Sequence, residues 1–355
     1  MNLQSSKNQK KIWYGWIVLS IVYFVMLSLI GTRSSFGFFF KQISNEFSWS
    51  RAETAAAFSI GMFAQSVCSL FSGWISDRFS IRLTMSAGIA IFGFSVLLGS
   101  QINSLAFFYL TYVLMNIGFA SSTWVAQVPT LSNWFVTKRG LALGISSSAQ
   151  GTAFILNFFT PILILTLGWR MSYVFFSILI LFITLPLAAI FHRDHPDQKN
   201  TVADQPFLDS ENIPTKKEKS FPKKILNEPV NFFSFRFFLF LVLFLPIAYV
   251  FTVLLVHFPA HLTDQGITDL SSAGIFAIWG ASLIVGYLIS SISDYYGRTS
   301  TFSTGSLLGV LSMFLIGKYN ISFEPWVIYV LTMTNGIALG LIRSTASAIM
   351  ADHFS

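Results

Sequence analysis

The sequence contains little charge and almost no cysteine. Charged residues make up 10% of its 355 residues, against 54% hydrophobic residues, which lies far from an average soluble domain. The single cysteine, Cys68, excludes an internal disulfide and is typical of helix packing rather than of a reactive thiol. The sequence has neither the Gly-x-x-x-x-Gly-Lys-Ser/Thr phosphate loop nor the His-Glu-x-x-His metal motif. We therefore expect no enzyme, no ATP-driven pump, no cofactor and no metal site.

Long apolar runs occupy most of the chain instead. Each of ten runs is near or above the roughly 20 apolar residues with which a helix crosses a bilayer. The 39 phenylalanines and 9 tryptophans include candidates for the aromatic belts at the membrane surfaces. The pattern predicts an all-α integral membrane protein in contact with the lipid bilayer. The runs are 12–40, 54–76, 83–100, 105–136, 141–168, 171–191, 237–260, 270–293, 299–317 and 325–350.

The basic residues are unevenly divided between the loops. Most of the 22 lysines and arginines lie before the first run or in loops on the same side, and four lie on the other side (Lys41, Arg51, Arg170 and Lys318). The positive-inside rule then predicts a multi-pass protein of the cell (inner) membrane with a cytoplasmic N-terminus. This distribution accounts for the net charge of +7 without a nucleic-acid partner. The first run is too long for a cleaved secretory signal, so we expect it to remain as a span.

The chain divides at residues 192–235, a polar segment rich in lysine. Such a segment cannot bury enough apolar surface to fold alone, which predicts a mobile cytoplasmic loop. Its end, from Lys223 to Phe233, is either plain linker or a short helix in the membrane interface. We therefore expect an N-terminal six-helix bundle in residues 1–191 and a four-helix C-terminal bundle in residues 236–355.

A motif repeats between the two halves. Gly73-Trp-Ile-Ser-Asp77-Arg78 follows the second run, and Ser290-Ser-Ile-Ser-Asp294 follows the eighth, 217 positions further on. A weaker correspondence relates Asn116 to Asn335. The halves are therefore expected to be copies with parallel topology.

The motif resembles the signature loop of the major facilitator superfamily, with Ser80 in place of its second glycine and Ser290 in place of the first glycine of the repeat. The resemblance extends to the branch of bacterial monocarboxylate and oxalate/formate porters. It implies two pseudo-symmetric bundles of six helices each. This chain supplies six spans of the first bundle and four of the second, so we expect a C-terminal truncation. A genuine ten-span variant is the alternative. The segments that resemble this branch are Gly15-Trp16, Ser35-Phe36-Gly37, Phe47-Ser-Trp-Ser-Arg51, Trp134-Phe-Val-Thr-Lys-Arg139-Gly, Gly168-Trp-Arg170 and His257-Phe-Pro-Ala-His261.

The signature loops are candidates for a gate at the cytoplasmic surface. A carboxylate at a helix end can bind basic side chains and the positive end of an opposing helix, and can thereby hold two bundles together. Ordinary solvated loops are the alternative interpretation. The candidate gating residues are Asp77, Arg78, Arg82, Arg139, Asp294 and Arg298.

Two arginines, Arg33 and Arg343, are the only charged residues inside the apolar runs. A charge in hydrocarbon is costly and usually marks a functional path, and a guanidinium suits a carboxylate. The resemblance implies that spans one, four, seven and ten line a central cavity. We therefore expect both arginines to bind an anionic substrate. The alternatives are that either side chain reaches the headgroups, or that Arg343 pairs with an acid beyond residue 355.

Other polar residues of the cavity spans are further candidates. Trp124 and Gln127 can share a helix face, and Asn116 and Tyr249 are comparable; helix packing is the alternative for all four. His257 and His261 are four residues apart with Pro259 between them, which favours a gate or loop anchor over a metal site. His257 is also a candidate proton relay.

These features together predict a secondary carrier that moves a small organic anion, a mono- or dicarboxylate, by alternating access. Proton or counter-anion coupling is open. Efflux of lipophilic drug-like compounds is an alternative within the class, and a non-transporting membrane sensor or assembly subunit is an alternative outside it.

Overall fold

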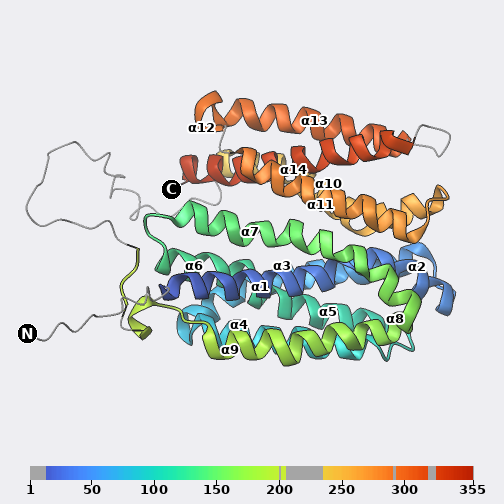
Figure 1. Cartoon of the computed structure of the whole chain (residues 1–355), viewed down its shortest axis with the longest axis horizontal. Helices are drawn as coiled ribbons and strands as arrows, with labels where there is room; N and C mark the ends of the chain where they lie inside the picture. The colour runs from blue at the N-terminus through green and yellow to red at the C-terminus, as the bar shows by residue number, and fades with distance from the viewer. Residues whose placement is uncertain (1–12, 200, 205–234, 291–292, 319–324, 355) are drawn as a thin grey trace, which may run out of the picture.

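A computed structural model describes residues 13–199, 201–204, 235–290, 293–318 and 325–354, and within these ranges it contains helices and no strands. Figure 1 shows the helices lying along a common axis. The α-helices are α1 (Tyr14–Ser34), α2 (Phe36–Phe47), α3 (Arg51–Arg78), α4 (Ile81–Gly99), α5 (Leu105–Ser122), α6 (Trp124–Trp134), α7 (Arg139–Leu156), α8 (Thr160–Ile178), α9 (Leu185–Phe191), α10 (Phe235–Asp264), α11 (Asp269–Ile289), α12 (Ser293–Tyr296), α13 (Arg298–Lys318) and α14 (Pro325–Phe354).

Side-chain caps begin several of the long helices. Ser50 and Glu53 form a reciprocal capping box at the start of α3, and the hydroxyls of Ser80, Ser104 and Thr268 accept the third backbone N–H of α4, α5 and α11. These caps satisfy N–H groups that have no partner inside the helix. The short polar segments between apolar runs therefore define where the helices start.

Nine stretches of the described residues are helical, long and apolar enough to cross a membrane, which confirms the predicted all-α membrane fold. One of them, Arg139–Phe191, is 53 residues long and reverses direction at Gly168, whose backbone (φ 79°, ψ 161°) is not helical. Figure 1 shows α7 running one way and α9 returning; α8 contains the reversal, so only its part after Gly168 belongs to the returning span. This stretch thus supplies two of the ten predicted spans.

Several spans are interrupted rather than uniform helices. The first extends to Phe47, beyond the predicted end at residue 40, with a break between α1 and α2. The fourth is divided at Thr123, which has non-helical angles (φ −107°, ψ −115°). A 3₁₀ turn (η1, Asn157–Phe159) and a π-helical turn (η2, Leu179–Thr184) interrupt the fifth and sixth. A hydropathy pattern does not register such local changes in hydrogen bonding.

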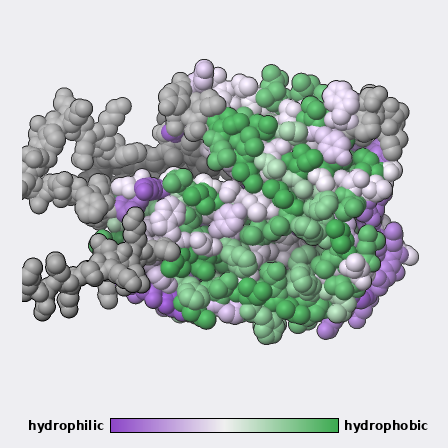
Figure 2. All heavy atoms as spheres, in the orientation of Figure 1, coloured by the Kyte–Doolittle hydropathy of each residue, from purple (hydrophilic) through white to green (hydrophobic). Residues whose placement is uncertain are grey.

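The surface is apolar around its middle and polar at both ends of the helices, as Figure 2 shows for one face. This is the distribution expected of a protein surrounded by lipid tails and bounded by two aqueous layers. We name the end at which α1 begins the N-terminal face and the other end the opposite face.

The helices form two groups (Figure 1), α1–α9 and α10–α14. They meet where α7 crosses α11 and where α2 contacts α10. At the first contact a Cβ on Gly151 would lie 2.6 Å from the carbonyl oxygen of Gly280, so the two backbones touch. Close approach at glycine is a frequent way for helices to associate in membranes.

The equivalent asparagines Asn116 and Asn335 are fully buried in their own helix groups. Asn116 donates to the Tyr112 carbonyl oxygen at 2.8 Å. Asn335 accepts from the Trp279 indole at 3.1 Å and donates to the Ser312 hydroxyl at 3.1 Å. Asn335 therefore joins α14 to α11 and α13, whereas the Asn116 hydrogen bond stays within α5.

The start of the predicted loop 192–235 is bound to the N-terminal face. Asp194 is 5% exposed and accepts the backbone N–H groups of Ile81 and Arg82, at 3.1 and 2.8 Å, at the start of α4. Asp204 accepts the backbone N–H groups of Thr137 and Lys138 at 3.1 and 2.9 Å before α7. Residues 194 and 204 of the predicted loop are therefore hydrogen-bonded to the N-terminal face, and the mobility of the loop stays a prediction. The segment from Lys223 to Phe233 lies outside the described residues.

Replacing Asp194 by alanine is expected to lower stability by about 0.5–2 kcal/mol, the usual value of a helix cap. Burial raises the pKa of Asp194, but hydrogen bonds from His192 and from the Arg82 and Ile81 amides outweigh it and lower the pKa below its ordinary value. A lowered carboxyl pKa stabilises the fold above the unfolded value of about 3.9 and loses this contribution as pH falls through the folded value.

The measurement is the melting temperature of the purified protein in detergent between pH 3 and 7. The difference between wild type and Asp194→Ala should shrink below about pH 4. Asp197→Ala is the matched control, because Asp197 is exposed. An equal difference at pH 3 and pH 7, or an equal loss in the control, would contradict the assignment.

Candidate substrate cavity

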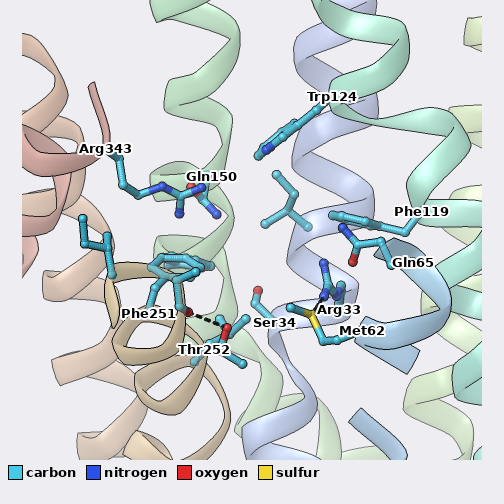
Figure 3. Close-up of a pocket in the computed structure, with 15 residues that line it drawn as sticks. Arg33, Ser34, Met62, Gln65, Phe119, Trp124, Gln150, Phe251, Thr252 and Arg343 are labelled. Atoms are coloured by element: carbon cyan, nitrogen blue, oxygen red, sulfur yellow. Dashed lines mark hydrogen bonds between the residues drawn. The ribbon is translucent and has the colours of Figure 1, made fainter. Parts of the chain in front are cut away.

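A cavity of about 240 Å³ lies between the two helix groups. Two arginines enter it from different groups, as Figure 3 shows: Arg33 from α1 and Arg343 from α14. The remaining walls are mostly apolar. They are formed by Ile30, Ser34, Met62, Gln65, Phe119, Trp124, Gln150, Phe154, Ile247, Ala248, Phe251, Thr252 and Leu255.

Arg33 is held inside the protein, with 9% of its surface exposed. Its guanidinium carbon lies 4.4 Å from the ring centre of Phe119 and 5.2 Å from that of Phe58, and one of its N–H groups donates to the Met62 sulfur. Aromatic faces stabilise a cation, but less than a carboxylate does. Within the described residues Arg33 forms no salt bridge, and its Nε is buried without a hydrogen-bond partner.

Arg343 lies across the cavity from Arg33. Its guanidinium carbon is 4.4 Å from the ring centre of Phe251, and Figure 3 shows the guanidinium reaching toward Gln150. The side-chain oxygen of Gln150 accepts from the Tyr287 hydroxyl at 3.2 Å. Each arginine is therefore supported by its own helix group and directed into the space between them.

The sequence interpretation missed four polar residues of the wall: Ser34, Gln65, Gln150 and Thr252. The Gln65 side-chain oxygen is buried without a hydrogen-bond partner in the described part of the chain. The two glutamines could have been identified from the sequence, because an amide side chain is rare in an apolar span. The serine and the threonine could not, because hydroxyl side chains are common in membrane helices. The two glutamines belong to spans two and five, which the family resemblance does not place around the cavity.

Of the other predicted ligand residues, only Trp124 lines the cavity. Gln127 is 4% exposed and donates to the Ser146 hydroxyl, and Asn116 is turned into the packing between α5 and α3, where it would meet a Cβ on Gly61. Tyr249 is 71% exposed on α10. These three residues are not among the cavity lining, because the direction of a helix face depends on how the helix is rotated within its bundle. Their role in substrate binding stays a prediction.

The predicted gating residues are dispersed over the N-terminal face. Asp77, Arg78 and Arg139 are exposed, and the Arg78 guanidinium lies 5.7 Å from the Trp74 ring. Among the salt bridges of the described residues none involves Asp77.

Arg82 donates its Nε–H to the Ala189 carbonyl oxygen at 2.8 Å instead of binding Asp77, because the open carbonyls at the end of α9 attract a cation. Arg298 begins α13, and the side chain of Asp294 lies outside the described residues.

His257 and His261 lie on α10, which continues through Pro259 to Asp264. His257 is exposed, and its ring centre is 6.1 Å from that of Phe40 on α2. Three His, Cys, Asp or Glu side chains do not gather anywhere in the described ranges in a way that could hold a metal ion. His257 therefore lies at the contact between α2 and α10 at the opposite face.

The same contact contains a charge cluster that the sequence interpretation did not include. Asp264, at the end of α10, accepts from Lys41 at 2.6 Å and from Arg51 at 2.8 Å. Both cations come from the first helix group, so this carboxylate joins the two groups. A Cβ on Gly37 would lie 3.0 Å from Pro259 Cγ and 3.2 Å from the Val256 carbonyl oxygen, which leaves no space between α2 and α10.

The fold and the cavity define a class: a polytopic helical membrane protein with a polar cavity between two helix groups. The family model of the Major Facilitator Superfamily matches residues 22–355. The chain belongs to this superfamily of membrane transporters.

The chain is 29% identical to the uncharacterized MFS-type transporter YcxA of Bacillus subtilis over 51% of this chain and 45% of that protein. It is 27% identical to monocarboxylate transporter 12 of Xenopus laevis over 44% of this chain and 34% of that protein. These alignments span less than half of the length of either relative. The crystal structure of a bacterial homologue of the lysosomal transporter Spinster, described as inward-facing and unoccupied, superposes with a TM-score of 0.69 at 14% identity over 96% of this chain and 75% of that one.

Proposed function

We propose that the chain is part of a secondary carrier that moves a small organic anion, a mono- or dicarboxylate, across the cell membrane by alternating access. One observation carries the proposal. A buried guanidinium, Arg33, faces the cavity with an unsatisfied Nε and with no carboxylate paired to it in the described residues. A buried cation without an ionic partner is costly, and an anionic substrate would supply the partner.

The position of the second arginine indicates where the anion would bind. Arg343 reaches the cavity from the other helix group, so an anion between the two would touch both groups. We assign residues 1–191 and 236–355 as the two bundles, Trp124 as a shape-determining wall, and the N-terminal face as cytoplasmic. The relative named as a monocarboxylate transporter supports this substrate class.

The residues that line the cavity bear on how substrate transport is coupled to the movement of a second ion. No Asp or Glu occurs among its described lining residues, so a proton has no acidic carrier there. We therefore propose that charge is balanced either by exchange against a counter-anion or by a proton that travels with the substrate.

The test is counterflow in proteoliposomes that contain the protein, loaded with members of a carboxylic-acid panel. Accelerated uptake of a labelled carboxylate, lost on substitution of Arg33, is the expected result. Uptake of neutral lipophilic compounds unchanged by Arg33→Gln and Arg343→Gln would instead favour drug efflux. Absence of counterflow with every anion would contradict the proposal and favour a non-transporting role.

A further inference from the structure

A second cavity lies on the outside of the first helix group, between α1, the α7–α8 region and the end of α8. Its volume of about 330 Å³ exceeds that of the central cavity and lies in the ~300–1,000 Å³ range of small-molecule sites. The 3₁₀ turn η1 and the π-helical turn η2 border it, and such turns are frequent at functional sites. We name it the lateral groove; its lining is Phe24, Leu27, Ser28, Gly31, Thr32, Ala153, Leu156, Asn157, Phe159, Thr160, Leu163, Phe175, Phe176 and Leu179.

The rim of the lateral groove belongs to the membrane-facing surface. Phe159 is 59% exposed, Phe175 is 47% exposed and Leu156 is 46% exposed, and all three lie on helices that span the apolar belt. A molecule dissolved in the bilayer can therefore reach the groove without crossing an aqueous layer. The described lining contains no charged residue, so it offers no cation to an anionic headgroup.

Two hydroxyls that line the groove have no hydrogen-bond partner among the described residues. Ser28 is 8% exposed and Thr160 is 3% exposed, yet neither side-chain hydroxyl makes a hydrogen bond with any residue that the structure describes. The neighbouring Thr32 behaves in the ordinary way, because its hydroxyl donates to the Ser28 carbonyl oxygen at 2.9 Å. A hydroxyl in an apolar environment without a hydrogen bond is unfavourable. The floor is thus suited to a ligand with one uncharged hydrogen-bonding group.

We propose that the lateral groove binds a free, uncharged lipophilic molecule that carries a single hydroxyl or carbonyl group. Ser28 is near the middle of the 34-residue helical stretch Tyr14–Phe47, about 20 Å along the axis from its start. The ester groups of membrane phospholipids lie in the headgroup layers at the edges of the ~30 Å hydrocarbon core. A small molecule that dissolves entirely in the hydrocarbon core can place its polar group at the depth of Ser28, whereas the ester groups of a phospholipid stay at the edges of the core.

The lateral groove is connected to the central cavity. Asn157, at its floor, donates to the Ser34 hydroxyl at 2.6 Å, and Ser34 lines the central cavity beside Arg33. Gly31 and Thr32 face the groove from the same helix. An occupant of the groove would therefore contact the helix that carries Arg33. The site itself does not rest on the proposed function, because its occupancy is measured without transport.

The experiment is photolabelling of the purified protein in nanodiscs with a diazirine-bearing octanol, followed by peptide mapping. We expect saturable labelling of the segments 24–32, 153–163 and 175–179. Octanol should reduce this labelling at least fivefold, and octane at the same membrane concentration less than twofold. Spread labelling of all membrane-facing helices, or equal competition by octane and octanol, would overturn the proposal.

Gly31→Leu is the filling variant. A Cβ on Gly31 would meet only the Ala153 Cβ, at 3.8 Å, so the first atom of a larger side chain is tolerated and its remainder enters the groove. We expect labelling to fall about tenfold. Gly317→Leu is the matched control, since Gly317 has no heavy atom within 4 Å of an added Cβ and lies at the end of α13; its labelling should equal that of wild type.

A double variant, Ser28→Ala with Thr160→Val, tests the polar part of the site separately. It removes both hydroxyls with little change in volume. The advantage of octanol over octane as a competitor should then drop below twofold, while total labelling stays within twofold of wild type. Labelling of the groove unchanged by Gly31→Leu, or an octanol advantage retained in the double variant, would contradict the assignment. If Gly31→Leu does not elute as a monodisperse protein, the double variant decides.

Discussion

Replacing Arg33 by glutamine is expected to weaken substrate binding roughly 10- to 150-fold. The estimate is the loss of about 1.5–3 kcal/mol that accompanies removal of a hydrogen bond to a charged group. Glutamine keeps a hydrogen-bonding end but not the charge, so an anion between Arg33 and Arg343 would lose one of its two cationic contacts. The measurement is the concentration dependence of carboxylate counterflow in proteoliposomes.

Two comparisons show whether charge or geometry carries this effect. Arg33→Lys keeps the charge but not the planar fork, and should fall between wild type and Arg33→Gln. Lys318→Gln removes a positive charge from an exposed position outside the cavity, and its half-saturation concentration should equal that of wild type. Equal affinities in Arg33→Gln and wild type would remove the basis of the organic-anion proposal, although the superfamily assignment would stand.

The second large effect is expected at Gly37, where α2 contacts α10. A valine at this position would meet Pro259 and the Val256 carbonyl oxygen, which already lie 3.0 and 3.2 Å from an added Cβ. Overpacking of a close contact costs about 1–3 kcal/mol. We therefore expect Gly37→Val to shift the protein roughly 5- to 150-fold toward a state in which the opposite face is open.

The readout is the reaction of Thr252→Cys with a membrane-impermeant maleimide, in a Cys68→Ser background. Thr252 lines the central cavity, and we propose that the opposite face is external in intact cells. Labelling should rise several-fold in Gly37→Val. Asp264→Asn, which weakens the ion pairs to Lys41 and Arg51, should raise it less, because such partly exposed pairs contribute about 0.2–1 kcal/mol each.

Gly317→Val introduces the same side chain at a position without close neighbours and should leave labelling unchanged. Labelling that stays at the wild-type rate in both Gly37→Val and Asp264→Asn would show that this contact does not close the opposite face.

Most of the fold was predictable because a bilayer imposes a simple rule. Every backbone group in hydrocarbon must be paired, so a long apolar run becomes a helix. The runs of residues 12–40 and 270–293 accordingly correspond to helical spans. The breaks were not predictable. Thr123 interrupts the fourth span, and η2 adds a π turn to the sixth, because these features depend on packing against neighbouring helices.

The candidate site was predictable where a residue was unusual in its environment. A charge in an apolar run is rare, and both Arg33 and Arg343 line the central cavity. Polar residues that are common in membrane helices could not be divided into substrate-binding and packing residues from the sequence. Gln127 and Tyr249 were expected to bind substrate, but one packs against Ser146 and the other is exposed.

The sequence alone determined that this protein is helical, lies in a membrane and carries two cations where cations are costly. Hydrophobic periodicity and charge are properties of the chain itself, so they are readable without a structure. Only the tertiary structure decided which faces of the helices meet. It brought Asp264 to Lys41 and Arg51, turned Asn116 away from the cavity, and left the Ser28 and Thr160 hydroxyls in a shared groove. These outcomes depend on how each helix is rotated and paired, and that is set by contacts between residues far apart in sequence.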